Sequence, residues 1–458
     1  MVEWLLNLNS QLNSIVWGPP MLIIIIGGGL YLTFRTGFSQ FTQFGRMTKE
    51  VFKFEKRETD AGDITPFQAI SVAMGGTVGV GNIAGVATAI ALGGPGALFW
   101  MLVSGVVGMC TKLVEVLLGV HFRVQEPGGP MIGGPMMVIE RGLGKSWKWL
   151  AVLFSLFGAL CAFGIGNMVQ ANSVAKGMLQ FGVAEWVTGL ILIIAVGLVT
   201  IGGIKRIAQV AQIIVPFMVI TYMIGGLIVI FARIGSLPSA IIDMFRYAFT
   251  PMGAIGGFAG ATVATAMRRG VARGVFSNEA GLGSAPMAHA TARTDHPSRQ
   301  ALWGIFEVFV DTIVVCTITG LAILVTGAYT AVDAAGKAFT GAALTIHAFE
   351  SVMPAFGAII VVGGMLLTSY DTNLAWCFYG ETCGAYLWGG KIRMPYRFIW
   401  LPFIMIGALG QLEAIWDISD TLNGLMAIPN MIAILLLAGL AAKLLNDFLK
   451  GQPYKPPA

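Results

Sequence analysis

Gly75-Gly-Thr-Val-Gly-Val-Gly-Asn82 and Phe276-Ser-Asn-Glu-Ala-Gly-Leu-Gly283 are glycine-rich stretches that lie about two hundred residues apart in strongly apolar sequence. Glycine weakens a helix interior and adopts backbone conformations that other residues avoid, so we expect a helix to be interrupted at each stretch. An unpaired backbone amide in hydrocarbon costs several kcal/mol. A broken helix at membrane depth is therefore tolerated only where protein or a polar cavity satisfies it.

The composition is that of a membrane protein. Hydrophobic residues make up 56% of the 458 residues and charged residues only 11%, whereas soluble domains have roughly 25% charged residues. The mean hydropathy is +0.78. Stretches of about 20 apolar residues predict roughly eleven membrane spans in an all-α protein. They cover residues 15–34, 66–92, 96–120, 149–176, 186–203, 207–231, 262–292, 300–327, 350–385, 398–415 and 425–447.

Neither a disulfide framework nor a leader peptide is indicated. The five cysteines lie in apolar segments without metal-ligand spacing, and we interpret them as small buried hydrophobes: Cys110, Cys161, Cys316, Cys377 and Cys383. Glu3 stands where a signal peptide carries positive charge, and no small-residue cleavage site follows the first apolar run. We expect that run to remain as a spanning helix.

Lysine and arginine are distributed unequally between the predicted connections, and their excess belongs on the cytoplasmic side. With the N-terminus outside, the cytoplasmic connections hold 20 of these residues and the outer connections hold 4. This distribution predicts that the N-terminus lies outside and the C-terminus in the cytoplasm. We expect a multi-pass protein of a prokaryotic cell membrane. The net charge of +5 reflects this topology and indicates no nucleic-acid partner.

The two glycine-rich stretches continue into related sequences. Gly79-Val-Gly-Asn-Ile-Ala-Gly-Val-Ala-Thr-Ala89 and Gly281-Leu-Gly-Ser-Ala-Pro-Met-Ala-His-Ala-Thr-Ala292 share a Gly-x-Gly-polar core and an Ala-Thr-Ala end. Chance recurrence of small residues is the alternative for the similarity alone. Each stretch also begins a unit of five predicted spans, and the two units enter the membrane from opposite sides. Interrupted spans in corresponding positions of two inverted halves are typical of a transporter's binding site.

We therefore divide the chain into five parts. An additional N-terminal helix, 1–36, precedes a basic amphipathic segment, 37–64, that we expect on the cytoplasmic membrane surface. The first repeat covers 65–233 and the second 234–447, and a cytoplasmic tail, 448–458, follows.

Further motifs carry a family resemblance. Gly93-Gly-Pro-Gly-Ala-Leu-Phe-Trp-Met-Leu-Val-Ser-Gly-Val-Val-Gly108 and the block from Gly274 to His289 resemble signatures of the alanine or glycine:cation symporter family. Thr111-Lys-x-x-Glu115 and Trp376-Cys-Phe-Tyr-Gly-Glu381 are further matches. The resemblance runs over essentially the whole chain. Leu102 departs from the family's usual tryptophan, and Asp371 from its usual small hydroxyl residue.

The resemblance implies a LeuT-like fold of the amino acid–polyamine–organocation superfamily: two inverted five-helix repeats, with substrate and sodium at the membrane midplane beside two unwound helices. Those helices would be the second and seventh spans. Gly79-Val-Gly-Asn82 is similar to the Gly-Leu-Gly-Asn run of LeuT-type sodium symporters. We therefore expect a secondary active symporter that imports alanine and glycine with sodium by alternating access. It would need no organic cofactor, would contact membrane lipid, and would work as a monomer.

An unwound helix can bind both the carboxylate and the ammonium group of an amino-acid zwitterion. Amides from Gly79 to Gly81 would begin a half-helix whose dipole favours a carboxylate. Carbonyls of Gly75, Gly76 and Val78 can face sodium or an ammonium group, and Thr77 lies among them. The alternative is that these glycines only pack helices together.

Other polar and aromatic residues complete the predicted substrate site. Thr372 and Trp376 are four residues apart and therefore share one helix face. The Thr372 hydroxyl suits a bound cation, and the Trp376 indole suits a cap over a small substrate side chain. Gln170 and Asn167 either line the pocket or bond a neighbouring helix. The chemistry of Phe276 is equally consistent with a packing role and with a lid over the substrate. The family resemblance favours the lid.

The resemblance also implies the cation sites. One sodium would bind carbonyls of Gly75 and Val78 with side chains of Asp371 and Thr372, and a second would bind Asn82 and Ser277. A carboxylate at Asp371 could be protonated instead, so proton coupling is the alternative. A channel or an intramembrane enzyme is disfavoured, because two interrupted helices suit an occluded site and no Gly-x-Ser-x-Gly or His-Glu-x-x-His motif is present.

Ionisable residues inside membrane spans usually pair with one another and face the interior of the bundle. We expect Lys112 to pair with Glu115, and Glu279, a further candidate for the substrate site, to brace the second break together with Arg273. Glu307 and Asp311 cannot easily both be ionised without nearby cations, and His289 is expected to be a packing histidine.

Overall fold

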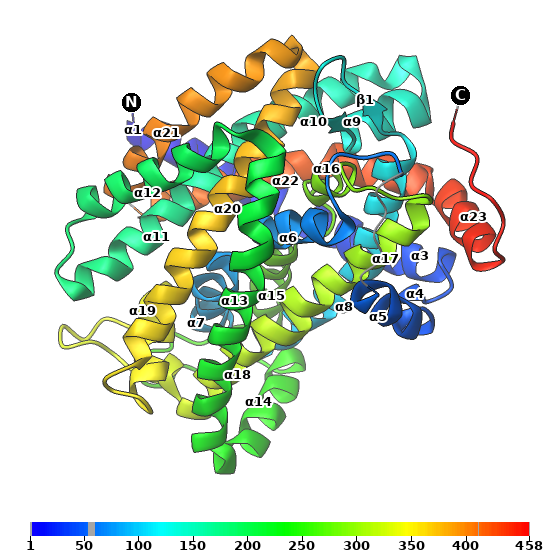
Figure 1. The fold of residues 1–458 in the computed structure, drawn as a ribbon. Coiled ribbons are helices and arrows are strands. Elements are labelled where there is room, and N and C mark those ends of the chain that lie inside the picture. Colours follow the sequence, from blue (N-terminus) through cyan, green and yellow to red (C-terminus); the bar gives the residue numbers. More distant parts are fainter. Residues whose placement is uncertain (1, 54–59, 411, 458) are drawn as a thin grey trace.

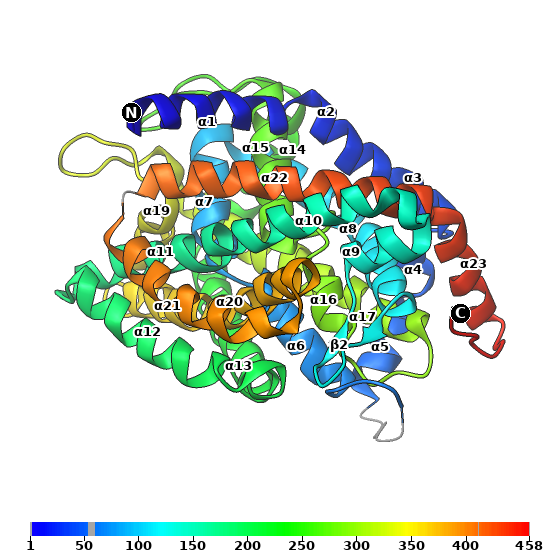
Figure 2. The ribbon, with the colours of Figure 1, turned by 90° about the horizontal axis from the view of Figure 1, so that it is seen from above.

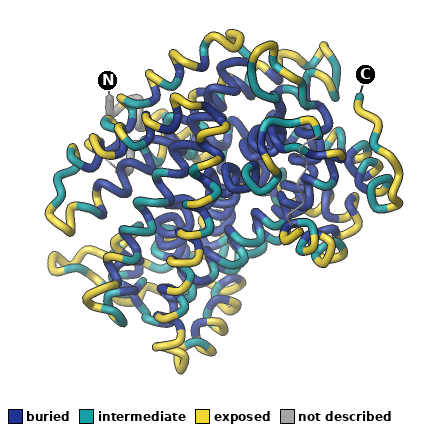
Figure 3. Tube along the Cα trace, viewed as in Figure 1, coloured by how far each residue is buried: buried dark blue, intermediate teal, exposed yellow. Residues whose placement is uncertain are grey.

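The computed structural model describes residues 2–53, 60–410 and 412–457 of the chain. It is a bundle of long helices with buried residues at its centre and exposed residues at its ends and perimeter (Figures 1 and 3). Within the described residues, eight helices are long and apolar enough to cross a membrane, or nine when one bent pair counts as a span. The expected all-α, multi-spanning class is confirmed.

The N-terminal helices lie along one edge of the bundle beside α22, as Figure 2 shows. This part contains α1 (Val2–Val16), α2 (Pro19–Leu22), η1 (Ile23–Gly27), α3 (Gly28–Arg35), α4 (Ser39–Thr42) and α5 (Phe44–Phe52). The predicted interfacial segment includes α4 and α5, and its residues 54–59 lie outside the described residues.

The predicted first repeat contains the first broken span and three long helices. Its elements are α6 (Pro66–Thr77), η2 (Val80–Asn82), α7 (Ala84–Gly93), α8 (Pro95–His121), β1 (Val124–Gln125), β2 (Met131–Ile132), α9 (Pro135–Met137), η3 (Val138–Leu143), η4 (Lys145–Trp147), α10 (Lys148–Cys161), η5 (Ala162–Met168), α11 (Val169–Met178), η6 (Leu179–Phe181), α12 (Glu185–Thr200) and α13 (Gly203–Ala232). Strands β1 and β2 form a short antiparallel hairpin between α8 and α9.

The remaining elements include the second broken span. They are η7 (Ile234–Ser236), α14 (Leu237–Phe249), α15 (Val263–Asn278), α16 (Ala285–His289), α17 (Pro297–Val308), η8 (Phe309–Cys316), α18 (Thr317–Thr326), η9 (Ala328–Thr330), α19 (Gly341–Glu350), α20 (Gly357–Trp388), η10 (Gly390–Ile392), α21 (Arg393–Leu409), α22 (Leu412–Leu436) and α23 (Ala438–Leu449). Elements η1, η3, η5 and η8 are π-helical turns within longer helices.

Both glycine-rich stretches interrupt a helix, as the sequence predicts. Helix α6 begins with a capping box between Thr65 and Gln68 and ends at Thr77, and the halves on either side of the break are bent by 54°. The second break follows α15, where Glu279, Gly281 and Gly283 have φ of 56°, 99° and 79°. This left-handed region favours glycine, and a glutamate there is uncommon.

Several element boundaries differ from the predicted spans. The segment predicted as 262–292 is α15 followed by only one short turn of helix, α16, because Gly281 and Gly283 stop the helix early. The predicted span 425–447 is two helices, α22 and α23, of which α22 already begins at Leu412. Helices α14 and α19 lie in segments where we predicted no element. The predicted span 398–415 includes residue 411, which is outside the described residues.

Large apolar side chains cover the outer faces of several helices. On α13 these include Ile213, Phe217, Ile220 and Ile224, spaced three to four residues apart. Exposed apolar faces of this extent require a nonpolar surrounding such as lipid. All five cysteines are free and buried, in agreement with their predicted packing role.

Candidate functional site

Four glycines of the first break each face a different side chain, and three of these side chains belong to the predicted site. A methyl group on Gly75 would lie 2.2 Å from Asp371 Oδ2, and one on Gly76 would lie 3.0 Å from Tyr379 Oη. Cβ atoms at Gly79 and Gly81 would lie 2.9 Å from Thr372 Oγ1 and 3.3 Å from the Phe276 ring. Glycine is therefore required at this break by close approach, in addition to helix interruption.

Two buried backbone amides at the break donate to side chains. Gly79 N donates to Asn82 Oδ1 at 3.0 Å, and Val80 N donates to Gln170 Oε1 at 3.2 Å. Gln170 also donates through Nε2 to Ile165 O at 2.9 Å, so it links the π-helical turn η5 to the break. Asn167 behaves differently, because its Nδ2 donates to Trp400 O of the neighbouring α21 at 2.9 Å. Of the two roles that we considered for these residues, Asn167 bonds a neighbouring helix, whereas Gln170 faces the break.

Helix α20 presents a hydroxyl and a carboxylate to the other side of the first break. Thr372 Oγ1 donates to Gly75 O at 2.8 Å. Asp371 is buried, and neither of its carboxylate oxygens has a hydrogen-bond partner among the described residues. A buried carboxylate without partners is costly unless it takes up a cation or a proton. Asp371, Thr372 and the Gly75 carbonyl therefore form a set of oxygen ligands suited to a hard monovalent cation.

The second break is bordered by aromatic rings. Phe276 stacks on Trp416 of α22 with ring centroids 4.9 Å apart, and it also packs against Gly81 of the first break. The Arg273 guanidinium lies over both rings, 5.3 Å from the Phe276 centroid and 4.6 Å from that of Trp416. Cation–π contacts of this kind hold the aromatic pair in place over the break.

Trp376 of α20 contacts the second break. Its Nε1 donates to Glu279 Oε1 at 2.7 Å, and its ring packs edge-on against Tyr379 with centroids 5.5 Å apart. The Tyr379 hydroxyl is buried and has no hydrogen-bond partner within the described part of the chain. A pair of broken helices thus meets a carboxylate, two hydroxyls and an indole from α20, which is the chemistry that a small zwitterion and a cation require.

Residues 2–455 match the profile of the sodium:alanine symporter family. The chain is 46% identical over 458 residues to the sodium/alanine symporter AgcS of Methanococcus maripaludis, with 97% of this chain and 98% of that protein covered. The chain belongs to the sodium:alanine symporter family. It is therefore a membrane transporter and not an enzyme.

This symporter is also similar to a second sequence relative and to a solved structure. It is 38% identical over 441 residues to a Bacillus subtilis protein named "Probable sodium/glutamine symporter GlnT", covering 96% of this chain and 89% of that protein. The solved structure of MhsT with L-phenylalanine matches with a TM-score of 0.56 and 12% identity, over 85% of this chain and 99% of that chain. The structural match concerns the fold alone and confirms the expected LeuT-like architecture.

Asn82 and Ser277 of the symporter converge on the carboxylate of Asp311, which was not among the predicted cation ligands. Asn82 Nδ2 donates to Asp311 Oδ1 at 2.7 Å, and Ser277 Oγ lies 3.1 Å from both Asp311 oxygens. Thr312 Oγ1 donates to Asp311 Oδ2 at 2.7 Å. The π-helical turn η8 positions Asp311 between the two breaks, and these oxygen atoms could coordinate a second cation.

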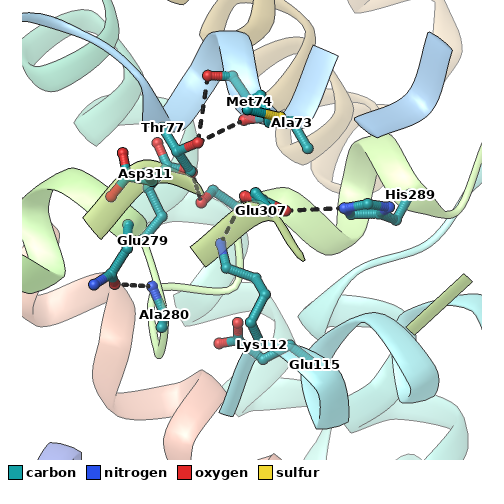
Figure 4. Close-up of polar contacts among 12 residues, drawn as sticks. Ala73, Met74, Thr77, Lys112, Glu115, Glu279, Ala280, His289, Glu307 and Asp311 are labelled. Atoms are coloured by element: carbon teal, nitrogen blue, oxygen red, sulfur yellow. Dashed lines mark hydrogen bonds and ion pairs between the residues drawn. The ribbon is translucent and has the colours of Figure 1, made fainter. Parts of the chain in front are cut away.

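The ion pair that we expected between Lys112 and Glu115 is wrong. Lys112 Nζ lies 3.1 Å from Glu307 Oε1, and both side chains are fully buried. Glu307 also contacts His289 Nε2 at 3.0 Å, as Figure 4 shows. Helix α17 packs against α8 and brings Glu307 to Lys112, whereas Glu115 accepts from Gly281 N at 2.9 Å. His289 is a fully buried, hydrogen-bonded packing residue, as expected.

Arg273 and Glu279, which we expected to brace the second break, have different partners. Arg273 pairs with Asp420 of α22 at 2.8 Å, whereas the Glu279 carboxylate contacts Trp376 of α20 and Ser284 on the far side of the break. The residues that sequence reasoning missed are Tyr379, Trp416 and Asp420. Tyr379 lies in the quoted Trp376 motif, three residues after the tryptophan, and this spacing was an available signal. Trp416 and Asp420 lie 140 and 147 positions from Phe276 and Arg273, and no local pattern connects them.

One arginine connects the ends of the two broken spans. Arg123, which follows α8, donates to Ala61 O at 2.8 Å in the chain that enters α6. It also donates to Ala290 O at 3.0 Å and Ala292 O at 2.6 Å, in the chain that leaves α16. Asp63 Oδ2 accepts from Met131 N of the β1–β2 hairpin at 2.6 Å. These contacts hold together the ends of α6 and α16 that lie away from the breaks.

Proposed function

We propose that this symporter imports alanine and glycine together with sodium by alternating access. The observation that carries the proposal is Asp371, a buried carboxylate whose two oxygens have no hydrogen-bond partner among the described residues, set against Gly75 of the broken α6. A sodium ion bound by Asp371, Thr372 and carbonyls of Gly75 and Val78 would neutralise this charge. Sodium binding would thereby stabilise the contact between α6 and α20.

The substrate would bind beside this cation at the first break. Its carboxylate would take amide donors of the Gly79–Gly81 segment, with Gln170 giving up its contact to Val80, and its ammonium group would face carbonyls near Gly76. Trp376 and Phe276 would close the pocket around the side chain. A bulky indole at this place favours glycine and alanine over larger amino acids by volume.

The decisive experiment is uptake of labelled alanine into proteoliposomes with and without an inward sodium gradient at fixed pH. We expect uptake that requires sodium. Equal uptake in both conditions would contradict sodium coupling, and uptake driven by a pH gradient alone would support the proton-coupled alternative. Counterflow of labelled alanine at equal sodium concentrations separates a carrier from a channel, since only a carrier exchanges substrate across a closed gate.

The substrate range is tested by replacing the indole. We expect Trp376→Ala to admit glutamine and other larger neutral amino acids, because removing an indole frees volume beside the bound side chain. Unchanged selectivity would remove Trp376 from the pocket. The sodium/glutamine name of the Bacillus subtilis relative makes glutamine the most informative competitor.

We further propose that the N-terminus lies outside and the C-terminus in the cytoplasm, as the distribution of lysine and arginine indicates. In this orientation, Arg123 lies near the cytoplasmic face and the Arg273–Asp420 pair lies toward the outside. The Asp311, Asn82 and Ser277 cluster is the proposed second cation site. Labelling of single cysteines at each terminus in intact cells tests the orientation.

A further inference from the structure

Trp376 is fixed by two residues that belong to different helices. Glu279, at the second break, accepts a hydrogen bond from Trp376 Nε1 at 2.7 Å. Gly166, in the π-helical turn η5, lies so close that a methyl group there would be 2.0 Å from Trp376 Cβ and 2.2 Å from Cγ. All three residues are buried. The indole therefore has a hydrogen bond at its polar edge and backbone directly behind it.

Both carboxylate oxygens of Glu279 accept hydrogen bonds from the protein. Its Oε1 accepts from Trp376, and its Oε2 accepts from Ser284 Oγ. Its backbone has φ of 56°, directly after the last residue of α15, so the break itself sets the direction of the side chain. Because both oxygens have protein donors, the carboxylate orients the indole rather than facing a substrate.

Gly166 affects the position of Trp376 by close packing rather than by a hydrogen bond. The same η5 segment continues to Gln170, which contacts Val80 of the first break. Any side chain at position 166 would push Trp376 away from η5. Glycine thus lets Trp376 lie as close to η5 as the packing of α20 on η5 permits.

We propose that Glu279 and Gly166 are positioning residues that set the upper size limit of the substrate side chain through Trp376. The proposal rests on the proposed function, in which Trp376 closes the pocket around a small amino acid. The two residues act in opposite senses. Glu279 prevents the indole from swinging out of the pocket, whereas Gly166 prevents it from filling the pocket.

The test compares four variants in proteoliposomes, with glycine, alanine and glutamine as substrates. Glu279→Gln keeps an oxygen acceptor for Trp376 Nε1 at the same length. Glu279→Asn keeps a residue that tolerates positive φ but is one methylene too short to reach the indole. Gly166→Ala adds the clashing methyl group. Gly363→Ala is the matched control on α20, because a methyl group there has no heavy atom within 4 Å.

We expect the kcat/KM ratio of alanine over glutamine to fall about tenfold in Glu279→Asn, the discrimination typical of a methylene-scale change in a pocket. Glu279→Gln should keep the parent ratio. Gly166→Ala should lower the ratio of alanine over glycine instead, since the displaced indole disfavours the larger of these two substrates. Ratios within one variant do not depend on the amount of folded protein.

Parent ratios in both Glu279→Asn and Gly166→Ala would overturn the proposal, as would equal losses in Glu279→Gln and Glu279→Asn. Failure of the proposed function has a different signature, namely sodium-independent uptake by the unmodified protein. In that case, thermal stabilisation of each variant by glycine, alanine and glutamine reports the same size ranking without any requirement for sodium coupling. A variant that does not fold is replaced by Gly166→Ser or Glu279→Asp, for which the same directions are expected.

Discussion

Arg273 of α15 and Asp420 of α22 form a two-pronged ion pair, with Nη1–Oδ1 at 2.9 Å and Nη2–Oδ2 at 2.8 Å. The guanidinium also covers the stacked rings of Phe276 and Trp416. The pair lies on the α15 side of the second break and joins α15 to α22. Under the proposed alternating access, we expect this contact to close the site on that side.

We expect Asp420→Asn to loosen this closure. A hydrogen bond to a charged group contributes about 1.5–3 kcal/mol, and the substitution leaves Arg273 largely buried without its countercharge. The thermal stability should fall and the substrate dissociation rate should rise. A double-mutant cycle with Arg273→Gln measures the coupling, and additive effects of the two substitutions would show that the pair has no energetic role.

Asp371→Asn should weaken sodium binding while leaving the shape of the site intact. Loss of a carboxylate ligand removes the only net charge among the proposed ligands, and we expect at least about a tenfold rise in half-saturating sodium, equivalent to about 1.4 kcal/mol. Sodium-dependent alanine uptake measures it. Asp371→Ser, which replaces the carboxylate with a small hydroxyl, serves as the comparison. An unchanged sodium dependence in both variants would place the cation elsewhere.

Much of the fold and part of the site follow from local sequence. Glycine acts on its own backbone, so the breaks at Gly79–Gly81 and Gly281–Gly283 can be predicted from the residues themselves. The four-residue spacing of Thr372 and Trp376 likewise places both on one face of α20.

Partners in the tertiary structure cannot be predicted in this way. Lys112 has a carboxylate three residues away on its own helix, yet its ion pair is with Glu307, 195 positions along the chain. Arg273 and Glu279 are six positions apart in sequence, but α22 supplies the partner of one and α20 the partner of the other. The packing of α8, α17, α20 and α22 decides these pairs, and a single sequence does not contain the register of that packing.

Gly75→Ala should damage the cation site selectively. The added methyl group would lie 2.2 Å from Asp371 Oδ2, whereas the methyl group of Gly363→Ala, on the same helix as Asp371, meets open space. Overpacking in a filled interior costs about 1–3 kcal/mol. We expect Gly75→Ala to lower both the melting temperature and the sodium affinity, and Gly363→Ala to change neither. Equal behaviour of the two variants in sodium-dependent thermal stability would contradict the close contact.

Arg123→Ala should open the side of the protein opposite to the Arg273–Asp420 pair. Arg123 donates to carbonyls of both Ala61 and Ala292, so its removal weakens the link between the chain that enters α6 and the chain that leaves α16. Backbone hydrogen bonds between the two chains remain, such as Arg293 N to Ile64 O at 2.8 Å. Because each charged hydrogen bond contributes about 1.5–3 kcal/mol, the loss is large enough to shift a conformational equilibrium by tenfold or more.

Lys205→Ala is the matched control, since Lys205 is an exposed cation in a connection predicted to be cytoplasmic. A single cysteine placed at Ser71 of α6 should react faster with a membrane-impermeant thiol reagent added from the cytoplasmic side in Arg123→Ala than in Lys205→Ala. Equal reaction rates in the two backgrounds would mean that Arg123 does not hold the two broken spans together.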